Sequence, residues 1–231
     1  MKLIYKYICL IYNLCFSLYE SFFLQKKKVN KIELYTFFKN IDFKAIDTNT
    51  FETKGNKYLE KIIFPEKDII NIINALFIKN DLTNKITDFT GFKYTIDFFT
   101  AYKIYKLNDV DRNKNVYANH FHRDKPYSKN MIKLIFSFKA VTESDGPMEV
   151  LNKKIFKVCL KQNEIFLFYP NKVYHRATSP ESGERFQMMF QLNPSKKWQL
   201  NRAIYKKQIL REPKFPFFSY LFDKKKLINY D

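Results

Sequence analysis

The pattern of apolar and polar positions along the chain changes near residue 90. From there to about residue 192, short apolar stretches with partial alternation are separated by polar turn clusters such as 108–115 and 143–147. Stretches of this length, rich in Val, Ile, Phe, Tyr and Thr, are typical of β-strands, whose successive side chains face opposite sides of a sheet. We therefore predict strands at 94–107, 116–122, 131–138, 148–151, 156–160, 164–169, 173–176 and 185–192.

The part of the chain before residue 89 follows a helical pattern instead. Apolar residues recur at helical spacing over 3–23, 31–38 and 65–77, and Pro65 with the acids after it suits a helix N-terminus. Residues 48–57 are polar, and we expect a loop there.

The many short strands with few helices between them predict a mainly β core of the α+β class, arranged as a sandwich or jelly roll. The length of 231 residues fits one domain with extensions or two small domains. We expect a single domain over 1–231, with a helical part (1–88), a β core (89–195) and a basic extension (196–231). The extension is predicted to contain a helix at 198–210, and the terminal helices are expected to buttress the sheet.

The chain is strongly basic, with 41 Lys and Arg against 23 Asp and Glu and a formal net charge of +18. Such a charge is typical of proteins that bind nucleic acid or another anionic surface. Only six of the basic residues are Arg, however, and Lys, Asn, Ile, Phe and Tyr are abundant together, as an AT-rich genome would encode. The balance favours compositional bias over nucleic-acid binding.

The N-terminus and the cysteines bear on the compartment. Three cysteines without paired spacing form no disulfide framework and no zinc motif, which favours a cytoplasmic protein. Lys2 and Lys6 precede an apolar run, as in a secretory signal, but Asn13 and Ser17 interrupt the run 8–19, which is too short to cross a bilayer. We expect an amphipathic helix packed on the body and no integral membrane span; a signal or membrane-associated helix is the alternative.

Two of the three histidines lie in the hexapeptide 119–124. Residues two apart in a strand face the same side, so His122 and Asp124 project together, and His120 shares that face. Imidazole and carboxylate suit Fe(II), Zn(II) or Mn(II), and His175 is the candidate third ligand. Two histidines and one carboxylate leave positions open on the metal, as in non-haem iron oxygenases. His120 competes with His122, and we assign it a supporting role.

Arg185 follows His175 by ten residues across a polar turn, a spacing that fits a hairpin returning the next strand beside the first. A planar guanidinium binds a carboxylate through two parallel hydrogen bonds. If 2-oxoglutarate chelates iron through its keto-acid end, its far carboxylate needs such a partner. Lys103 and Tyr105, on a predicted strand near the expected pocket, are further candidates for binding the co-substrate; the alternative is that they are ordinary sheet residues.

The segment 119–195, about a third of the chain, resembles the Fe(II)- and 2-oxoglutarate-dependent dioxygenases of the phytanoyl-CoA dioxygenase family. These enzymes have a double-stranded β-helix, a cupin-like jelly roll, which the resemblance implies for 89–195. The matching features are Phe121-His122-Arg123-Asp124, the strand 133–138, the Gly146-Pro147 step, and His175 followed by Arg185.

The resemblance implies that His122, Asp124 and His175 bind iron and that Arg185 binds the 2-oxoglutarate carboxylate. It also implies that Arg123 lies near the co-substrate. These assignments follow the order and spacing of the motif as a whole, because each short element is weak by itself.

The chain departs from the family pattern two residues after the distal histidine. The family often has a small hydroxyl residue there, whereas this chain has Ala177, and Thr178 or Ser179 are the candidates to replace it. The departure bears on how the co-substrate is held and leaves the proposed metal ligands unchanged.

The sequence therefore predicts a dioxygenase that uses Fe(II), 2-oxoglutarate and O₂ to hydroxylate a small organic substrate, with decarboxylation of 2-oxoglutarate to succinate. Two alternatives stay open: a non-catalytic cupin-like protein that binds an anionic partner, and a nucleic-acid-modifying oxygenase. Substrate identity and oligomeric state do not follow from the sequence.

Overall fold

A seven-stranded antiparallel sheet forms the centre of the computed structural model, which describes residues 2–24, 29, 33–44, 46–47, 49–111, 114, 116–124 and 128–200. The predicted strands at 94–107, 131–138, 164–169 and 185–192 are confirmed as β4, β5, β8 and β10, with bounds shifted by a few residues. Across the sheet the order is β1 (Tyr35–Phe38), β8 (Ile165–Phe168), β5 (Ile132–Phe136), β10 (Glu184–Ser195), β4 (Lys93–Tyr105), β3 (Leu59–Ile62) and β2 (Thr53–Asn56).

A smaller antiparallel sheet faces the large one and consists of β7 (Lys154–Val158), β6 (Met148–Asn152) and β9 (Tyr174–Arg176). Buried side chains from both sheets, including Val150 of β6 and Phe166 and Phe168 of β8, pack into one core. Two facing antiparallel sheets over an apolar core form a jelly-roll-like sandwich, which agrees with the predicted class.

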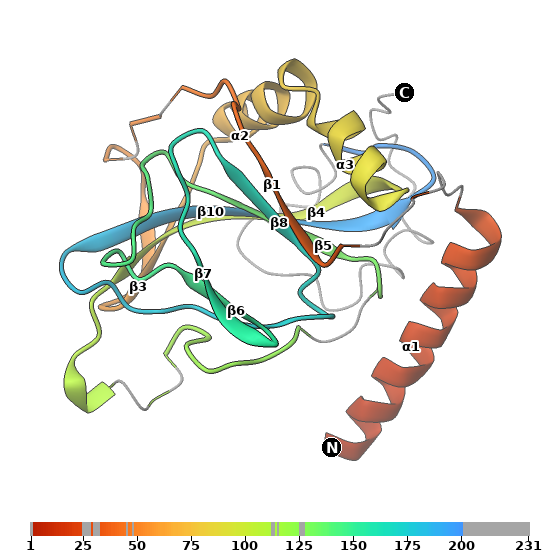
Figure 1. The fold of residues 1–231 in the computed structure, drawn as a ribbon, viewed down its shortest axis with the longest axis horizontal. Coiled ribbons are helices and arrows are strands. Elements are labelled where there is room, and N and C mark those ends of the chain that lie inside the picture. Colours follow the sequence, from red (N-terminus) through yellow and green to blue (C-terminus); the bar gives the residue numbers. More distant parts are fainter. Residues whose placement is uncertain are drawn as a thin grey trace.

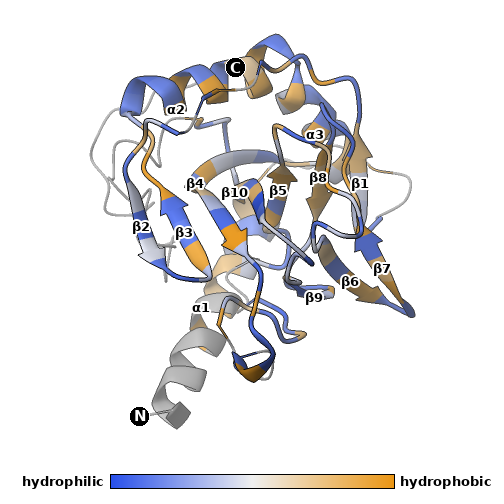
Figure 2. Ribbon diagram, turned by 90° about the vertical axis from the view of Figure 1, so that its left-hand side faces the viewer, coloured by the Kyte–Doolittle hydropathy of each residue, from blue (hydrophilic) through white to orange (hydrophobic). Residues whose placement is uncertain are grey.

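Helices cover the opposite face of the large sheet (Figures 1 and 2). They are α2 (Glu66–Ile73), the π-helical turn η1 (Asn74–Lys79) and α3 (Leu82–Thr90). Their apolar faces join the core of the large sheet, where the ring of Phe77 meets that of Phe190 edge to face at 5.3 Å. The helix predicted at 65–77 is confirmed, and Trp198 is buried in the same core.

Helix α1 (Lys2–Phe23) projects from one side of the molecule (Figure 1). Near its C-terminal end the buried carboxylate of Glu20 accepts hydrogen bonds from the Ser128 hydroxyl and from Asn130 Nδ2, the latter at 2.8 Å. These contacts tie the helix to the chain just before β5. Among the described helices, none combines the length and apolar character needed to cross a membrane.

A β-bulge in β4 decides which of its side chains face the small sheet. Gln191 and Leu192 are neighbours on β10 but pair with β4 residues that are two apart, so Asp97 is the extra residue. One extra residue reverses the facing of everything beyond it. Even-numbered residues from 98 to 104 therefore point into the space between the sheets, whereas Phe99 faces the helices.

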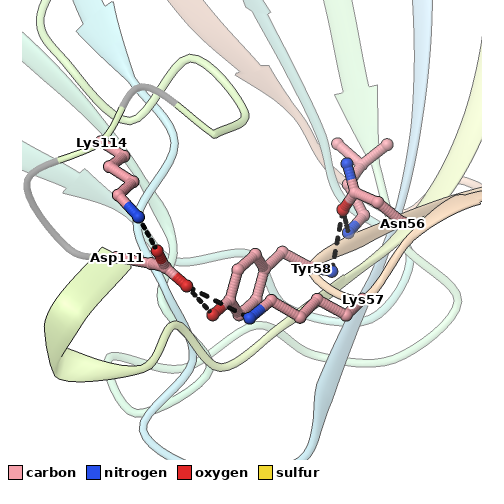
Figure 3. Close-up of polar contacts among 6 residues, drawn as sticks. Asn56, Lys57, Tyr58, Asp111 and Lys114 are labelled. Carbon is pink, nitrogen blue, oxygen red and sulfur yellow. Dashed lines mark hydrogen bonds and ion pairs between the residues drawn. The ribbon is translucent and has the colours of Figure 1, made fainter.

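A polar cluster around Asp111 ties the β2–β3 hairpin to the segment that follows β4 (Figure 3). Asp111, at the end of the short 3-10 helix η2 (Asp109–Asp111), accepts hydrogen bonds from the Tyr58 hydroxyl and from Lys57 Nζ at 3.2 Å. Lys114 Nζ lies 2.7 Å from its other oxygen. These partners hold the pKa of Asp111 well below its ordinary value. Next to the cluster, buried Tyr58 packs with Tyr117 and other apolar side chains.

Replacing Asp111 with Asn is expected to loosen this attachment without disturbing the sheets. The amide keeps an acceptor for Tyr58 but removes the charge that pairs with Lys57 and Lys114. We expect amide hydrogen exchange at Tyr117 to become about fivefold faster, since losing one such interaction shifts a local opening equilibrium by roughly that factor. Exchange in β5 should not change, and equal acceleration there would contradict the local role.

Three local predictions were wrong. The helix expected at 31–38 is instead the strand β1 (Tyr35–Phe38), because the rings of Tyr35 and Phe37 pack at tilted angles against Phe166 in the core between the sheets. The loop expected at 48–57 contains the exposed edge strand β2. The described residues before 89 thus form the strands β1, β2 and β3 as well as helices.

The third error concerns 116–122, which forms no regular strand. Its main chain meets the segment around His175 through a bridge at His122 and a hydrogen bond from Ala177 N to Ala118 O at 3.0 Å. The division of the chain at residues 88 and 195 stays a prediction. The helix expected at 198–210 and the basic extension lie almost entirely in 201–231, outside the described residues.

Candidate metal centre and its cavity

Main-chain hydrogen bonds hold His122 and His175 directly opposite each other. His122 N donates to His175 O at 3.0 Å, and His175 N donates to His122 O at 2.9 Å. The imidazole centroids are consequently only 4.4 Å apart. Asp124 N donates to Pro170 O at 3.1 Å, which fixes the residue two beyond His122 against the turn before β9.

The side chains of these three residues bring their donor atoms together. Asp124 Oδ1 lies 3.6 Å from Nε2 of His122 and 3.6 Å from Nε2 of His175, and the three potential ligand atoms lie within 4.8 Å of one another. Nδ1 of His122 faces the carbonyl of His120 at 2.8 Å, and Nδ1 of His175 faces that of Val173 at 3.3 Å. Because a carbonyl only accepts, each Nδ1 carries the proton and each Nε2 keeps its lone pair for a metal.

Burial and charge keep these groups in their metal-binding forms. Burial lowers the pKa of His175 to about 4, so its imidazole is neutral at pH 7. Burial alone would raise the pKa of Asp124, but the neighbouring Lys133 and the two histidines outweigh it and lower the pKa. Neutral imidazole and ionised carboxylate are the forms that bind metal ions.

A cavity of about 300 Å³ extends from the two histidines into the space between the sheets. That volume is at the lower end of the ~300–1,000 Å³ typical of small-molecule sites. Its walls are mostly apolar, and across them Gln187 Nε2 donates to the Tyr102 hydroxyl at 2.6 Å. The other polar or basic side chains in the lining, besides the histidines, are Lys61, Thr100, Tyr117, Lys133 and Arg185.

Arg185 lines this cavity with its guanidinium buried and, within the described chain, without hydrogen bonds. The residue is 3% exposed, and neither Nε nor Nη1 nor Nη2 has a hydrogen-bond partner there. The buried hydroxyl of Tyr117 on the same lining also has none. Burial lowers the pKa of Arg185, yet a guanidinium stays charged in proteins. A buried cation without an acceptor is costly, so this region of the cavity suits a carboxylate.

Comparison with solved structures finds similar folds at low sequence identity. EctD from S. alaskensis with bound Fe has a TM-score of 0.51 and 13% identity, covering 83% of this chain and 86% of that one. HygX from Streptomyces hygroscopicus with nickel, 2-oxoglutarate and hygromycin B has a TM-score of 0.47 and 9% identity, covering 72% and 85%. An oxidoreductase of the 2OG-Fe(II) oxygenase family from Burkholderia pseudomallei has a TM-score of 0.49 and 10% identity. This match covers 67% of this chain and 77% of that one.

The likeness to EctD establishes a shared fold across most of both chains. No family model matches the sequence, and no curated protein matches it either. The fold is therefore common to this chain and an iron-containing protein, and the chemistry has to be argued from the side chains of the site.

Three of the residues predicted to contact the co-substrate lie away from the cavity. Arg123 is exposed, and its guanidinium stacks 4.3 Å from the ring centroid of Tyr174. Lys103 pairs with Glu184 at 3.0 Å, and the Tyr105 hydroxyl donates to a carboxylate oxygen of Glu60 at 2.8 Å.

The contact of these three residues with a co-substrate therefore stays a prediction. Lys103 and Tyr105 are odd-numbered residues beyond the bulge of β4, and none of the three belongs to the lining of the cavity.

The hydroxyls expected to compensate for Ala177 are engaged elsewhere. Thr178 Oγ1 donates to Pro147 O at 2.5 Å, and Ser179 Oγ accepts from Leu107 N at 2.7 Å. This close packing requires Gly146, since a Cβ there would come within 2.3 Å of the Ser179 carbonyl carbon. Ala177 itself lines the cavity.

Sequence reasoning did not assign six polar residues of the described cavity lining: Lys61, Thr100, Tyr102, Tyr117, Lys133 and Gln187. Lys133 had a readable signal, because a lysine inside the apolar run 131–138 is unusual unless it has a buried partner. Gln187 also had one, because it lies two residues after Arg185 on the predicted strand 185–192 and therefore shares its face. The direction of Tyr102 depends on the bulge in β4, and that of Tyr117 depends on an irregular segment, so neither could be counted along the sequence.

Proposed function

We propose that this protein is an Fe(II)- and 2-oxoglutarate-dependent oxygenase, with His122, Asp124 and His175 as the iron ligands. The observation that carries the proposal is the convergence of two imidazole Nε2 atoms and one carboxylate oxygen beside a cavity. A buried guanidinium lines the same cavity and has no hydrogen-bond partner within the described chain. Two nitrogen donors and one oxygen donor with neighbouring open space fit the facial arrangement of non-haem iron.

The chain's own residues explain how iron would be retained. The carbonyls of His120 and Val173 fix both imidazoles in the tautomer that directs Nε2 toward Asp124. The main-chain pairing of the two histidines sets their separation before any metal binds. Iron held there supplies oxygen activation coupled to oxidative decarboxylation of 2-oxoglutarate.

Arg185 is the proposed partner of the 2-oxoglutarate carboxylate remote from iron. Its guanidinium offers donors in a planar fork, which matches a carboxylate, and Tyr117 adds a hydroxyl that lacks a hydrogen-bond partner within the described chain. The apolar remainder of the lining would orient a small organic substrate and exclude water from the reaction. Within this proposal the core is a double-stranded β-helix of the phytanoyl-CoA dioxygenase type, and the reaction is a hydroxylation.

Turnover of 2-oxoglutarate tests the proposal directly. Purified protein with Fe(II), ascorbate and air should convert 2-oxoglutarate to succinate, slowly without substrate and faster once a screen finds the substrate. Absence of Fe(II) binding in an anaerobic titration would contradict the proposal. Strongly salt-dependent polyanion binding together with no succinate would favour the non-catalytic alternative.

Tyr117→Phe tests the proposed co-substrate contact. The substitution removes one hydroxyl that has no hydrogen-bond partner in the described chain, so folding stability should change little. Loss of one hydrogen bond to a charged group should raise the KM for 2-oxoglutarate roughly tenfold. Steady-state kinetics of succinate formation would measure it. An unchanged KM would remove Tyr117 from the binding site.

A further inference from the structure

Lys133 is a buried lysine in direct contact with the carboxylate of the candidate metal centre. It lies on β5 among apolar neighbours, is 7% exposed, and points to the cavity side of the large sheet. Its Nζ lies 2.5 Å from Asp124 Oδ2. Buried lysines are uncommon unless they are paired, so the position has a specific electrostatic partner.

The two oxygens of Asp124 have different surroundings. Oδ2 faces the ammonium of Lys133, whereas Oδ1 faces Nε2 of both His122 and His175 at 3.6 Å. A carboxylate with both oxygens accessible can bind a metal through one of them or through both. The ammonium occupies one of these two sites before any metal arrives.

From this geometry we propose that Lys133 is a positioning residue that restricts Asp124 to a single metal bond through Oδ1 and serves as its counter-ion when no metal is bound. The inference rests on the proposed iron site and adds a role for a residue outside the ligand set. Its functional consequence is that one more position on the metal stays available to the co-substrate.

The contact between Lys133 and Asp124 also affects the charge balance among the three candidate ligands. The carboxylate of Asp124 is largely buried beside two imidazoles, where a counter-ion is favourable, and Lys133 provides one. A metal that arrives then meets ligands already held in place, but also a fixed positive charge nearby that opposes it. Lys133 thus makes metal binding weaker than the ligands alone would make it, while keeping the site open.

Lys133→Met tests this in full-length protein, because it keeps an unbranched side chain one atom shorter than lysine and removes the charge. Anaerobic calorimetric titration should show Fe(II) or Co(II) binding at least about threefold tighter, since the opposing charge is gone. 2-Oxoglutarate should bind the metal-loaded variant at least about tenfold more weakly, since Asp124 can then take a second position. The metal-free variant should melt at a lower temperature, and metal should raise that temperature by more than it does in the wild type.

Opposite changes in the two affinities separate positioning from general damage, which would weaken both. Lys133→Arg should restore both affinities toward those of the wild type. Lys103→Met is the matched control, because Lys103 is also an ion-paired lysine on a strand but lies outside this cavity. It should leave both affinities unchanged.

The experiment distinguishes a failure of the role proposed for Lys133 from a failure of the proposed oxygenase function. Weaker metal binding by Lys133→Met, or unchanged 2-oxoglutarate affinity, would overturn the role of Lys133 while leaving the oxygenase proposal standing. A wild-type protein that binds neither metal would overturn the proposed function itself.

Discussion

His122→Ala and Asp124→Ala are each expected to abolish metal-dependent conversion of 2-oxoglutarate to succinate. Each removes one of three converging donor atoms, and two ligands hold iron poorly. The loss should exceed about 100-fold, the upper range for losing groups that merely support metal ligands. Succinate assays should be paired with anaerobic Fe(II) titration, so that lost activity can be traced to lost metal.

The matched control is His120→Ala. His120 is exposed and supports His122 only through its main-chain carbonyl, which the substitution retains. Activity should therefore stay near that of the wild type. Because Asp124→Ala strands the ammonium of Lys133, Asp124→Asn should be measured beside it as a closer mimic in shape. Full activity in His122→Ala would contradict the assigned ligand set.

The sequence predicted the meeting of the histidines and Asp124, though partly for the wrong reason. The prediction assumed a regular strand at 116–122, in which residues two apart share a face. In the structure, only His122 forms a bridge, and Asp124 is held by the carbonyl of Pro170. The predicted proximity of the three residues is nevertheless correct. Several main-chain contacts bring them together, at His122 and at Asp124, and a regular strand is not needed.

Lys103 and Tyr105 lie outside the described lining of the cavity for a single physical reason. Facing in a strand can be counted along the sequence only while pairing is regular, and the bulge at Asp97 shifts the count by one. Nothing in the β-rich run 94–107 marks that bulge. The sheet class and the strands of the core were predictable from apolar alternation, whereas the choice of face along β4 required the pairing with β10.

The helix wrongly expected at 31–38 illustrates a different limit. The strand Tyr35–Phe38 has only four residues, three of them aromatic, and so short an apolar run is compatible with either a helix or a strand. The outcome is decided by distant partners, since Tyr35 and Phe37 pack against Phe166. Such tertiary contacts override a local pattern that is only one or two turns long.

Arg185→Met is expected to separate ligand binding from stability. No hydrogen-bond acceptor within the described chain loses its partner when the guanidinium is removed, and an unpartnered buried charge is costly. The melting temperature of the ligand-free protein should therefore stay the same or rise. Affinity for 2-oxoglutarate should fall at least roughly 30-fold, because losing one member of a buried charge pair costs about 2–5 kcal/mol.

Fe(II) affinity should not change in Arg185→Met, because none of the three converging donor atoms belongs to Arg185. Calorimetric titration of Fe(II) and then 2-oxoglutarate, beside thermal melts, would measure all three quantities. Arg123→Met is the matched control: Arg123 is exposed and stacked on Tyr174, so its loss should leave 2-oxoglutarate affinity intact. A large fall in stability of Arg185→Met without ligand would mean that the guanidinium is held by the protein itself, and the cavity would then lack its anion site.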